Sequence, residues 1–580
     1  MGIMGTRAAL WIAVALFVAP MVLAMIDDPV QVCQTLQPSP TLEPFVDKLP
    51  KLKQIRIDHG KQVVLGAYKI QQKLHRDLPP TTMYAYGTSA ATASVPGPTL
   101  LATSGVESYV RWENHIHDEY HMLPVDKTLM WANPSKGGVP IVTHLHGAEC
   151  DSASDGYPDS WHTAKGEHGP TFTTLNFTYA NTQSPAMLWY HDHAFGITRV
   201  NVLSGLSGFY LIKAHSNSPK PSWFPKRKQE LHLMLQDKQL FYNGSINFPN
   251  VGDSPANHPQ WCPEYFGDTI IVNGKAWPYV HVEPRTYRLR FLNAANARVF
   301  VLSLDNPNLT FTQIGTDGGL LERAQSLKVL TLAPAERIDC LVDFSHAAGT
   351  EVILNNTGAA PYPSGDPTFS PPSTLAVMKF IVKKKTKTIR DAPVPAKLRA
   401  ADPLVKTGNA LVRQLFMVEN DDADGNPLES LLSNHTWHDE VTEKPELGAT
   451  EIWEFINFTP DAHPMHIHLI EFKALNQQPF DLDKWTAGEC EIFNTTFATP
   501  GTCFTGEPIA PSYNQIGLKD TILSLPNHVT RVVVQWKSQQ NNGKFTFDAT
   551  AGPGFVWHCH ILDHEDNDMM RPIKLVKKSR

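Results

Sequence analysis

Most of the chain alternates between short runs of β-branched and aromatic residues and clusters of Pro, Gly, Asn and Asp. Such runs, bounded by turn residues, are typical of β-strands. The 46 prolines also oppose long helices. The pattern therefore predicts an all-β protein.

A short phrase returns three times along this pattern, as Arg111-Trp112-Glu113-Asn114, Arg290-Phe291-Leu292-Asn293 and Glu454-Phe455-Ile456-Asn457. Each copy stands where a strand is expected to end. A phrase that recurs at a similar spacing indicates repeated domains. We predict three related domains, at residues 40–216, 225–392 and 404–580, with linkers rich in Pro and Lys near 216–225 and 383–403.

The first and last of these domains carry the H-x-H pairs His144/His146, His191/His193, His466/His468 and His558/His560, and the middle domain carries none. Alternate side chains of a strand share one face, so each pair presents two imidazoles together. One such pair is a common chance feature, but eight buried imidazoles without a metal ion would be costly. We expect the two outer domains to meet and form a cluster site from His144, His146, His191, His193, His466, His468, His558 and His560.

A second set of ligands surrounds Cys559, between His558 and His560. A thiolate, an imidazole and a distant thioether hold a blue, electron-transferring copper, and His564 and Met569 follow in the same segment. Electrons taken at Cys559 could leave through its covalent neighbours. In the first domain Asp192 stands where Cys559 stands in the last, so only the last domain has a thiolate site.

Length and composition set the class of protein. At 580 residues, with 42% hydrophobic and 18% charged residues, the chain is a globular protein several times the usual domain size of about 150 residues. A net charge of -7 argues against nucleic-acid binding. We expect a monomer.

The N-terminal segment indicates secretion. Arg7 precedes an apolar run at 8–23 that contains Pro20, and Ala24 offers a cleavage site, so residues 1–24 are expected to be a signal peptide. We expect no stable membrane insertion, because no other apolar stretch is long enough to span a bilayer. The secretory pathway, the cell wall or apoplast, and the endoplasmic reticulum are all compatible destinations. Seven glycosylation sequons fit this route, at Asn176, Asn243, Asn308, Asn355, Asn434, Asn457 and Asn494.

Seven cysteines, less the ligand Cys559, leave six, an even number that suits an oxidising compartment. Cys490 and Cys503 flank one loop and are expected to pair. The sequence leaves the connectivity of Cys33, Cys150, Cys262 and Cys340 open.

With these motifs in this order, the chain resembles the multicopper oxidases of the bilirubin-oxidase and spore-coat-laccase branch. The resemblance implies three cupredoxin-like Greek-key β-barrels and four copper ions per chain. His463, Cys559, His564 and the axial Met569 would bind type 1 copper. His144 and His466 would bind type 2 copper, and the type 3 pair would take His146, His191, His193, His468, His558 and His560.

The resemblance also implies the reaction. A donor would give single electrons at the type 1 site, and the cluster would reduce O2 to water. Glu565 and Asp155 match acids that supply protons in spore-coat laccases. An aspartate before Gly156 is equally typical of a turn.

Segments around Glu264, Val272 and Asp366 resemble the plant low-phosphate-root oxidases, a group associated with ferroxidase activity and root responses to phosphate shortage. Carboxylates beside the type 1 site would attract Fe(II) and stabilise Fe(III) more. Asp461 is the expected rim residue, two positions before His463, and Glu264 and Asp366 would complete an iron site. Solvated loop acids are the alternative interpretation of the latter two.

Three other functions stay open at this stage. The first is an oxidase of small organic donors, of the laccase type acting on phenols or the bilirubin-oxidase type acting on tetrapyrroles. The second is a non-enzymatic cell-surface relative, although no ligand position is missing. The third is a copper store.

Overall fold

The computed structural model describes residues 36–215, 217–218, 221–384, 391–400, 407–408 and 410–578. The expected signal peptide at 1–24 and Cys33 lie outside the described residues. In the described part, helices are short, and none of them is both long and apolar enough to cross a bilayer. Strands dominate, which confirms the predicted all-β class.

The first predicted segment forms two sheets, a five-stranded one in the order β1-β4-β9-β8-β6 and a four-stranded one in the order β3-β2-β5-β7. Their strands are β1 (Gln54–Arg56), β2 (Val63–Gln72), β3 (Thr81–Gly87), β4 (Gly97–Thr103), β5 (Ser108–Asn114), β6 (Thr143–His146), β7 (Asn176–Tyr179), β8 (Met187–Asp192) and β9 (Ser207–Lys213). Between β8 and β9 lies the helix α1 (Thr198–Ser204).

The middle segment forms a seven-stranded sheet in the order β12-β11-β10-β14-β19-β16-β17 and a five-stranded sheet in the order β13-β21-β20-β15-β18. Their strands are β10 (Glu230–Lys238), β11 (Thr269–Val272), β12 (Lys275–Ala276), β13 (Tyr279–Val282), β14 (Thr286–Asn293), β15 (Phe300–Leu304), β16 (Phe311–Thr316), β17 (Gly319–Leu327), β18 (Val329–Leu332), β19 (Arg337–Asp343), β20 (Glu351–Asn356) and β21 (Ala376–Val382).

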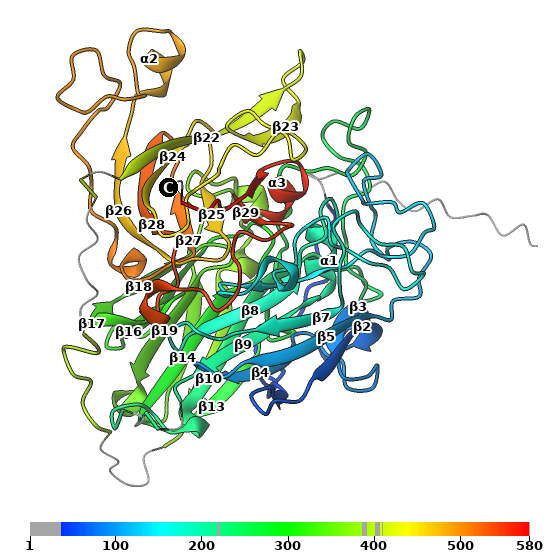
Figure 1. Ribbon diagram of the computed structural model, residues 1–580. Helices are drawn as coiled ribbons and strands as arrows, with labels where there is room; N and C mark the ends of the chain where they lie inside the picture. Colours follow the sequence, from blue (N-terminus) through cyan, green and yellow to red (C-terminus); the bar gives the residue numbers. More distant parts are fainter. Residues whose placement is uncertain are drawn as a thin grey trace, which may run out of the picture. The chain divides into compact units, whose positions relative to one another are not determined.

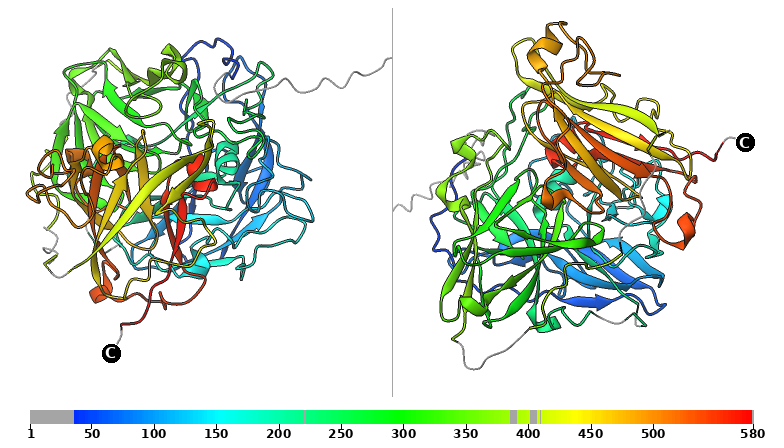
Figure 2. Two further views of the ribbon diagram at one scale, coloured as in Figure 1. Left: turned by 90° about the horizontal axis from the view of Figure 1, so that it is seen from above. Right: turned by 90° about the vertical axis from the view of Figure 1, so that its left-hand side faces the viewer.

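The last segment forms a five-stranded sheet in the order β23-β22-β24-β28-β26 and a four-stranded sheet in the order β27-β25-β29-β30. Its elements are β22 (Leu411–Asp421), β23 (Pro427–Leu432), β24 (Thr450–Asn457), β25 (His463–Ile467), β26 (Phe472–Pro479), α2 (Leu482–Thr486), β27 (Thr521–Ser524), β28 (His528–Gln535), β29 (Phe555–Cys559), α3 (Leu562–Asp566) and β30 (Met570–Ile573). In Figures 1 and 2 these strands, coloured yellow to red, lie together on one side of the blue and green strands. Each of the six sheets takes its strands from one predicted segment.

The repeated phrase has the same structural role in all three segments. Asn114, Asn293 and Asn457 each end a strand, β5, β14 and β24. Each of these strands pairs in parallel with an earlier strand of its segment. Each asparagine Oδ1 accepts the N–H two residues ahead, and each Nδ2 donates to two carbonyls. In the second and third copies one of these carbonyls lies in the outgoing loop, at Arg298 and Asp461, and the other lies far along the chain. The phrase thus fixes the loop that leaves each strand.

Asn457 corrects one expectation from the sequence. Its side chain is fully buried, and its Nδ2 donates to Asp461 O at 2.7 Å and Ser524 O at 3.2 Å. A glycan cannot be attached to this nitrogen in the folded protein, so this sequon is a structural motif.

The cysteines divide into two groups. Cys490 and Cys503 form the predicted disulfide, and Cys262 is also disulfide-bonded. Cys150 and Cys340 are free and buried. The even count of six therefore did not correspond to three disulfides, because these two thiols are core residues.

The core continues without interruption from the first segment into the middle one. The last segment has its own core, built around Trp453, Trp536 and Trp557. Trp557 lies on β29 directly before His558 and packs against Trp453, with ring centroids 5.5 Å apart. This packing holds β29 in place and so positions the residues that follow.

Candidate metal centres

Two strand pairs bring the H-x-H histidines together. β6 pairs with β8 so that His144 lies opposite His191, and β25 pairs with β29 so that His466 lies opposite His558. The alternation of a strand then turns the second histidine of each pair to the same side. All eight imidazoles are at most 1% exposed.

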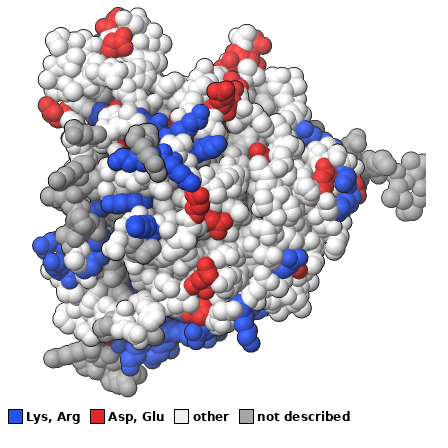
Figure 3. All heavy atoms as spheres, viewed as in Figure 1, with Lys and Arg blue, Asp and Glu red and all other residues white. Residues whose placement is uncertain are grey.

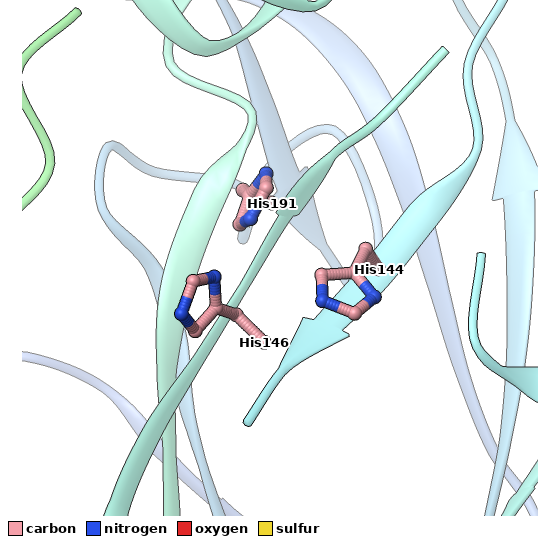
Figure 4. Close-up of side chains that lie close together, drawn as sticks. All are labelled: His144, His146 and His191. Atoms are coloured by element: carbon pink, nitrogen blue, oxygen red, sulfur yellow. The ribbon is translucent and has the colours of Figure 1, made fainter. Parts of the chain in front are cut away.

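The two outer segments interlock at these rings. His144 stacks on His468 with ring centroids 3.8 Å apart, and His146 stacks on His466 at 3.7 Å. Figure 4 shows His144, His146 and His191 with their rings around a common space. Ring nitrogens of these three, of His144, His466 and His468, and of His193, His468 and His558 each lie within 4.8 Å of one another. The predicted meeting of the outer segments therefore occurs.

Oxygen acceptors hold one nitrogen of most of these rings and leave the other free. The Nδ1–H groups donate as follows: His144 to Asp155 O (2.5 Å), His191 to Asp192 O (2.8 Å), His466 to Asp520 O (2.7 Å), His468 to Asp155 Oδ2 (2.7 Å) and His558 to Cys559 O (2.9 Å). The Nε2 atoms of His144, His191 and His466 are buried without a hydrogen-bond partner. Such second partners fix the tautomer of a metal-binding histidine.

The protonation of the rings also fits metal binding. Burial lowers the pKa well below its ordinary value for His146, His191, His193, His466, His468 and His560. Neutral imidazoles have a free lone pair, which is the form that binds metals. The residues present therefore fit a copper cluster.

The second centre surrounds Cys559. The Cys559 Sγ lies 3.4 Å from His463 Nδ1 and 3.9 Å from His564 Nδ1, and the two nitrogens are 3.2 Å apart. Met569 is buried beside them, because its carbonyl accepts the Cys559 N–H and its own N–H donates to His564 O, both at 3.0 Å. One thiolate, two imidazoles and a neighbouring methionine match the ligand set of a blue copper.

The two predicted proton-relay acids both reach the cluster. Asp155 Oδ2 accepts from His468, and its Oδ1 lies 3.6 Å from the Cys150 thiol. Glu565 is fully buried, with its two carboxylate oxygens 3.3 Å from His193 Nδ1 and 3.1 Å from His558 Nδ1. These acids therefore face the outer nitrogens of the three rings in one ligand group.

An acidic rim adjoins the outer edges of the Cys559 centre. Asp461 Oδ1 lies 3.4 Å from His463 Nε2. Glu264 lies against Asp461, and burial together with the charge of Asp461 raises the pKa of Glu264 well above its ordinary value. Glu419, on β22, places Oε1 3.9 Å from His463 Nε2 and 3.8 Å from His564 Nε2.

Asp366 has a different environment. Its side chain is exposed and accepts the Thr368 N–H at 2.7 Å, as the N-cap of the 3-10 helix η5 (Pro367–Phe369). The same loop reaches the rim through the Tyr362 carbonyl, which accepts the Ala462 N–H at 2.8 Å. The part of Asp366 in the rim stays a prediction.

Sequence reasoning missed three residues of these centres. Glu419 lies in a strand without any motif, and Arg337 and Asp520 lie far from the histidine pairs in sequence. The one sequence feature that could have indicated Glu419 is its position in the strand that precedes, and pairs with, the strand ending at Asn457.

A cavity of about 1160 Å³ lies apart from the acidic rim. Residues of all three segments line it, among them Lys213, Arg337, Glu471 and Lys473. Figure 3 shows Lys and Arg side chains gathered on the left and lower parts of the face viewed there, with Asp and Glu more scattered. Arg337 lines this cavity and also donates to Asp520 Oδ1, which accepts the His146 Nε2–H.

Comparisons with known proteins agree with this geometry. Multicopper oxidase family models match residues 239–378 and 411–579. The chain is 41% identical to multicopper oxidase LPR1 homolog 1 of Oryza sativa subsp. japonica, over 93% of each chain. It is also 41% identical to multicopper oxidase LPR2 of Arabidopsis thaliana, over 92% of this chain and 93% of the relative. A laccase of Bacillus subtilis is 37% identical over 92% of this chain and 99% of its own length.

The crystal structure of the McoA multicopper oxidase from Aquifex aeolicus has the same fold, with a TM-score of 0.69 at 23% identity, covering 91% of this chain and 99% of that one. The predicted cupredoxin-like architecture is thereby confirmed. The chain belongs to the multicopper oxidase family, whose members are copper-dependent oxidoreductases that use O2 as the electron acceptor.

Proposed function

We propose that this multicopper oxidase is a ferroxidase, which oxidises Fe(II) to Fe(III) at the acidic rim of the Cys559 centre and delivers the electrons to O2. The observation that carries the proposal is the convergence of Glu264, Glu419 and Asp461 on the outer edges of His463 and His564. The resemblance to the plant low-phosphate-root oxidases, a group associated with ferroxidase activity, favours the same substrate, and two plant LPR multicopper oxidases are each 41% identical to this chain.

Carboxylates favour this reaction for an electrostatic reason. Carboxylate oxygens are hard ligands, and the attraction between an ion and a nearby negative charge grows with the charge of the ion. A rim of acids therefore stabilises Fe(III) more than Fe(II), which makes the loss of an electron easier. Asp461 Oδ2 accepts no hydrogen bond from an N–H or hydroxyl group, and the Asp461 carboxylate meets the Glu264 carboxyl, so the two acids could hold an ion together in place of the proton that they share.

The chain offers a short route from the rim to the cluster. Asp461 lies 3.4 Å from His463 Nε2, and His463 Nδ1 lies 3.4 Å from Cys559 Sγ. Cys559 is covalently joined to His558 and His560, and the Cys559 carbonyl also accepts the His558 Nδ1–H. Each step passes through a bond or a close contact.

The ligand roles follow this arrangement. We assign type 1 copper to His463, Cys559 and His564 with Met569 as the axial ligand, and type 2 copper to His144 and His466. One type 3 copper is assigned to His146, His191 and His560, and the other to His193, His468 and His558. Copper at these residues supplies one-electron transfer from the donor and the four-electron reduction of O2 to water.

Protons for water formation are assigned to the two buried acids. Asp155 and Glu565 lie on the outer side of the rings that they contact, between those rings and the surrounding protein. A carboxyl group in hydrogen-bond reach of a reaction site can donate and recover protons.

Oxidation of a small organic donor is the second candidate, supported by the 37% identical laccase of Bacillus subtilis. The two candidate substrates require different chemical surfaces at the rim of the Cys559 centre. An organic donor needs an apolar surface beside His564, whereas Fe(II) needs the carboxylates.

Replacing Asp461 by Ala tests the choice. We expect the rate of Fe(II) oxidation, as kcat/KM, to fall at least about tenfold, the equivalent of one lost interaction of roughly 1.4 kcal/mol with the ion. The rate with a phenol should change much less, because that donor does not bind through a carboxylate. Asp424→Ala is the matched control, since Asp424 is an exposed acid in the hairpin that follows β22. If Asp461→Ala leaves iron oxidation unaffected, the ferroxidase proposal is wrong.

Entry into the secretory pathway is a further part of the proposal. The disulfide between Cys490 and Cys503 supports it, because disulfides persist in oxidising compartments. The apoplast, the cell wall and the endoplasmic reticulum are the proposed destinations. Glycan analysis of the protein from its native cells tests this route.

A further inference from the structure

A buried network of charged side chains joins the three segments beside the histidine cluster. The middle segment supplies Asp317, Glu336 and Arg337, and the last segment supplies Lys519 and Asp520; each of these residues is at most 1% exposed. Lys519 Nζ lies 2.9 Å from Asp317 and 3.0 Å from Glu336. The network therefore crosses from the middle segment, which carries none of the candidate copper ligands, into the last segment, which supplies residues to both centres.

Asp520 connects this network to two rings of the cluster. Its Oδ1 accepts the His146 Nε2–H at 3.0 Å, and its backbone carbonyl accepts the His466 Nδ1–H at 2.7 Å. These two rings stack on each other and come from different segments. One residue thus holds a ring from each outer segment.

The two ring nitrogens of His146 have the opposite roles from those of the neighbouring histidines. In five rings the Nδ1–H donates to an oxygen, whereas in His146 the Nε2–H donates to Asp520 Oδ1. The five rings are His144, His191, His466, His468 and His558. The Nδ1 of His146 is left buried without a partner. Asp520, together with the neighbouring Thr521 Oγ1 at 3.2 Å from the same Nε2, therefore selects which nitrogen of His146 faces the cluster.

Arg337 fixes Asp520 in turn. Its guanidinium donates from Nη1 to Asp520 Oδ1 at 2.7 Å and from Nη2 to Asp520 Oδ2, while its Nε donates to Met187 O at 3.1 Å. A two-point contact between a guanidinium and a carboxylate sets orientation as well as distance. The acid can then turn only with the arginine, whose guanidinium also donates to Ala335 O at 3.0 Å and lies 3.6 Å from Asp317 Oδ1.

Gly147 leaves the space that this pair needs. A Cβ at this position would lie 2.6 Å from Asp520 Oδ2 and 2.8 Å from Arg337 Nη2, and the backbone there has φ +87°. The residue after His146 thus has no side chain at the point where the ion pair approaches.

We propose that Arg337 of the middle segment is a positioning residue for the copper cluster, which acts through Asp520 to hold His146 with Nδ1 toward the metal and to align His466. The middle segment, which binds no copper, is in this way part of the cluster's ligand support. This positioning role of Arg337 affects the histidine cluster alone and does not depend on which electron donor the enzyme oxidises.

Arg337→Met in the copper-loaded protein tests this. Loss of an outer partner of a metal ligand typically weakens metal binding about 10- to 100-fold. We expect cluster copper to be lost to a chelator about 10- to 100-fold more readily than from the unsubstituted protein, with an altered type 2 electron paramagnetic resonance signal. The blue absorption of the type 1 site should be unchanged.

Arg288→Met is the matched control. Arg288 also makes a two-point contact with an aspartate, Asp339, in the same sheet, but it contacts no cluster residue. We expect this variant to keep its cluster copper. Equal loss of cluster copper from both variants, or none from Arg337→Met, would overturn the proposal.

A double variant covers the case in which Arg337→Met does not fold. Arg337→Met leaves the Asp520 charge without its arginine, whereas Arg337→Met with Asp520→Asn removes both charges together. The double variant should keep the blue absorption and lose cluster copper to the same extent. A double variant that retains its cluster copper as firmly as the parent protein would contradict the positioning role.

Discussion

At the residue scale, three asparagine side chains fix the loops that leave three strands. Asn114, Asn293 and Asn457 each close a strand, and the side chain of each forms at least three hydrogen bonds that fix the outgoing loop. In the last segment that loop carries Asp461 and His463. The same pattern of asparagine hydrogen bonds therefore stabilises the fold in the middle segment and supports the Cys559 centre in the last one.

Replacing Asn293 by Ala tests this role where no copper is bound. The change leaves two buried carbonyls and one N–H without their partner, and each unsatisfied group costs about 1 to 3 kcal/mol. We expect the free energy of unfolding to fall by roughly 2 to 4 kcal/mol in a denaturant titration. The exposed Asn133, replaced by Ala, should have little effect. Equal stability of both variants would show that the loop does not depend on Asn293.

How much of the site the sequence predicts depends on distance along the chain. The H-x-H pairs and Cys559 are local patterns whose geometry follows from the strand repeat, and the structure brings them together. Arg337 and Asp520 act across contacts between residues hundreds of positions apart, such as the pair His146 and Asp520, which no local pattern encodes. Cys150 and Cys340 show the same limit, because a count of cysteines does not separate thiols from disulfides.

At the scale of elements, two short helices connect the outer segments. α3 carries His564 and Glu565, and its last residue, Asp566, accepts the N–H groups of Thr198 at 3.0 Å and Arg199 at 2.8 Å at the start of α1. Negative charge at a helix N-terminus is stabilising. This contact holds the type 1 ligand loop against the first segment.

Asp566→Ala should loosen that contact. Two buried N–H groups lose their acceptor, which we expect to lower the free energy of unfolding by about 1 to 3 kcal/mol. The exposed Asp548, whose side chain serves a local turn and lies 3.8 Å from the exposed Lys577, provides the control as Asp548→Ala. Denaturant unfolding with the blue absorption as the probe measures both. An unchanged transition in Asp566→Ala would mean that α1 needs no cap.

Strand pattern made the elements predictable, and helices were the exception. The β-branched runs and the turn residues marked the strands that carry the ligands, and the Asn phrases marked three strand ends. α1 and α3 have only 7 and 5 residues, too few for a helical repeat to stand out. The contact between these two helices joins residues far apart in the sequence and is made only by the tertiary fold.

At the scale of the whole molecule, the three segments contribute different residues to the two centres. The outer two supply the imidazoles of the histidine cluster, the last supplies the residues of the Cys559 centre, and the middle one supplies Glu264 and Arg337. Burial of charged groups where the segments meet makes the stability of the assembly sensitive to pH. Glu471 is the clearest case, because burial raises its pKa to about 8.

Glu471 predicts the direction of this dependence. In the unfolded chain its carboxyl ionises near 4.5, but in the folded protein it stays protonated up to about 8. Between these values the unfolded state binds fewer protons, so stability falls as pH rises through the window, by up to about 1.4 kcal/mol for each pKa unit. Glu471→Gln cannot ionise and should lose less stability from pH 5 to pH 8. Parallel Tm profiles for the two proteins would contradict the assigned protonation.

The most direct test is a count of copper against the blue absorption in fully loaded, purified protein. We expect four copper ions per chain, one of which gives the thiolate-to-copper charge-transfer band, and we expect this band to bleach when a donor is added without O2. Fewer than four ions per chain, or no such band, would contradict this expectation.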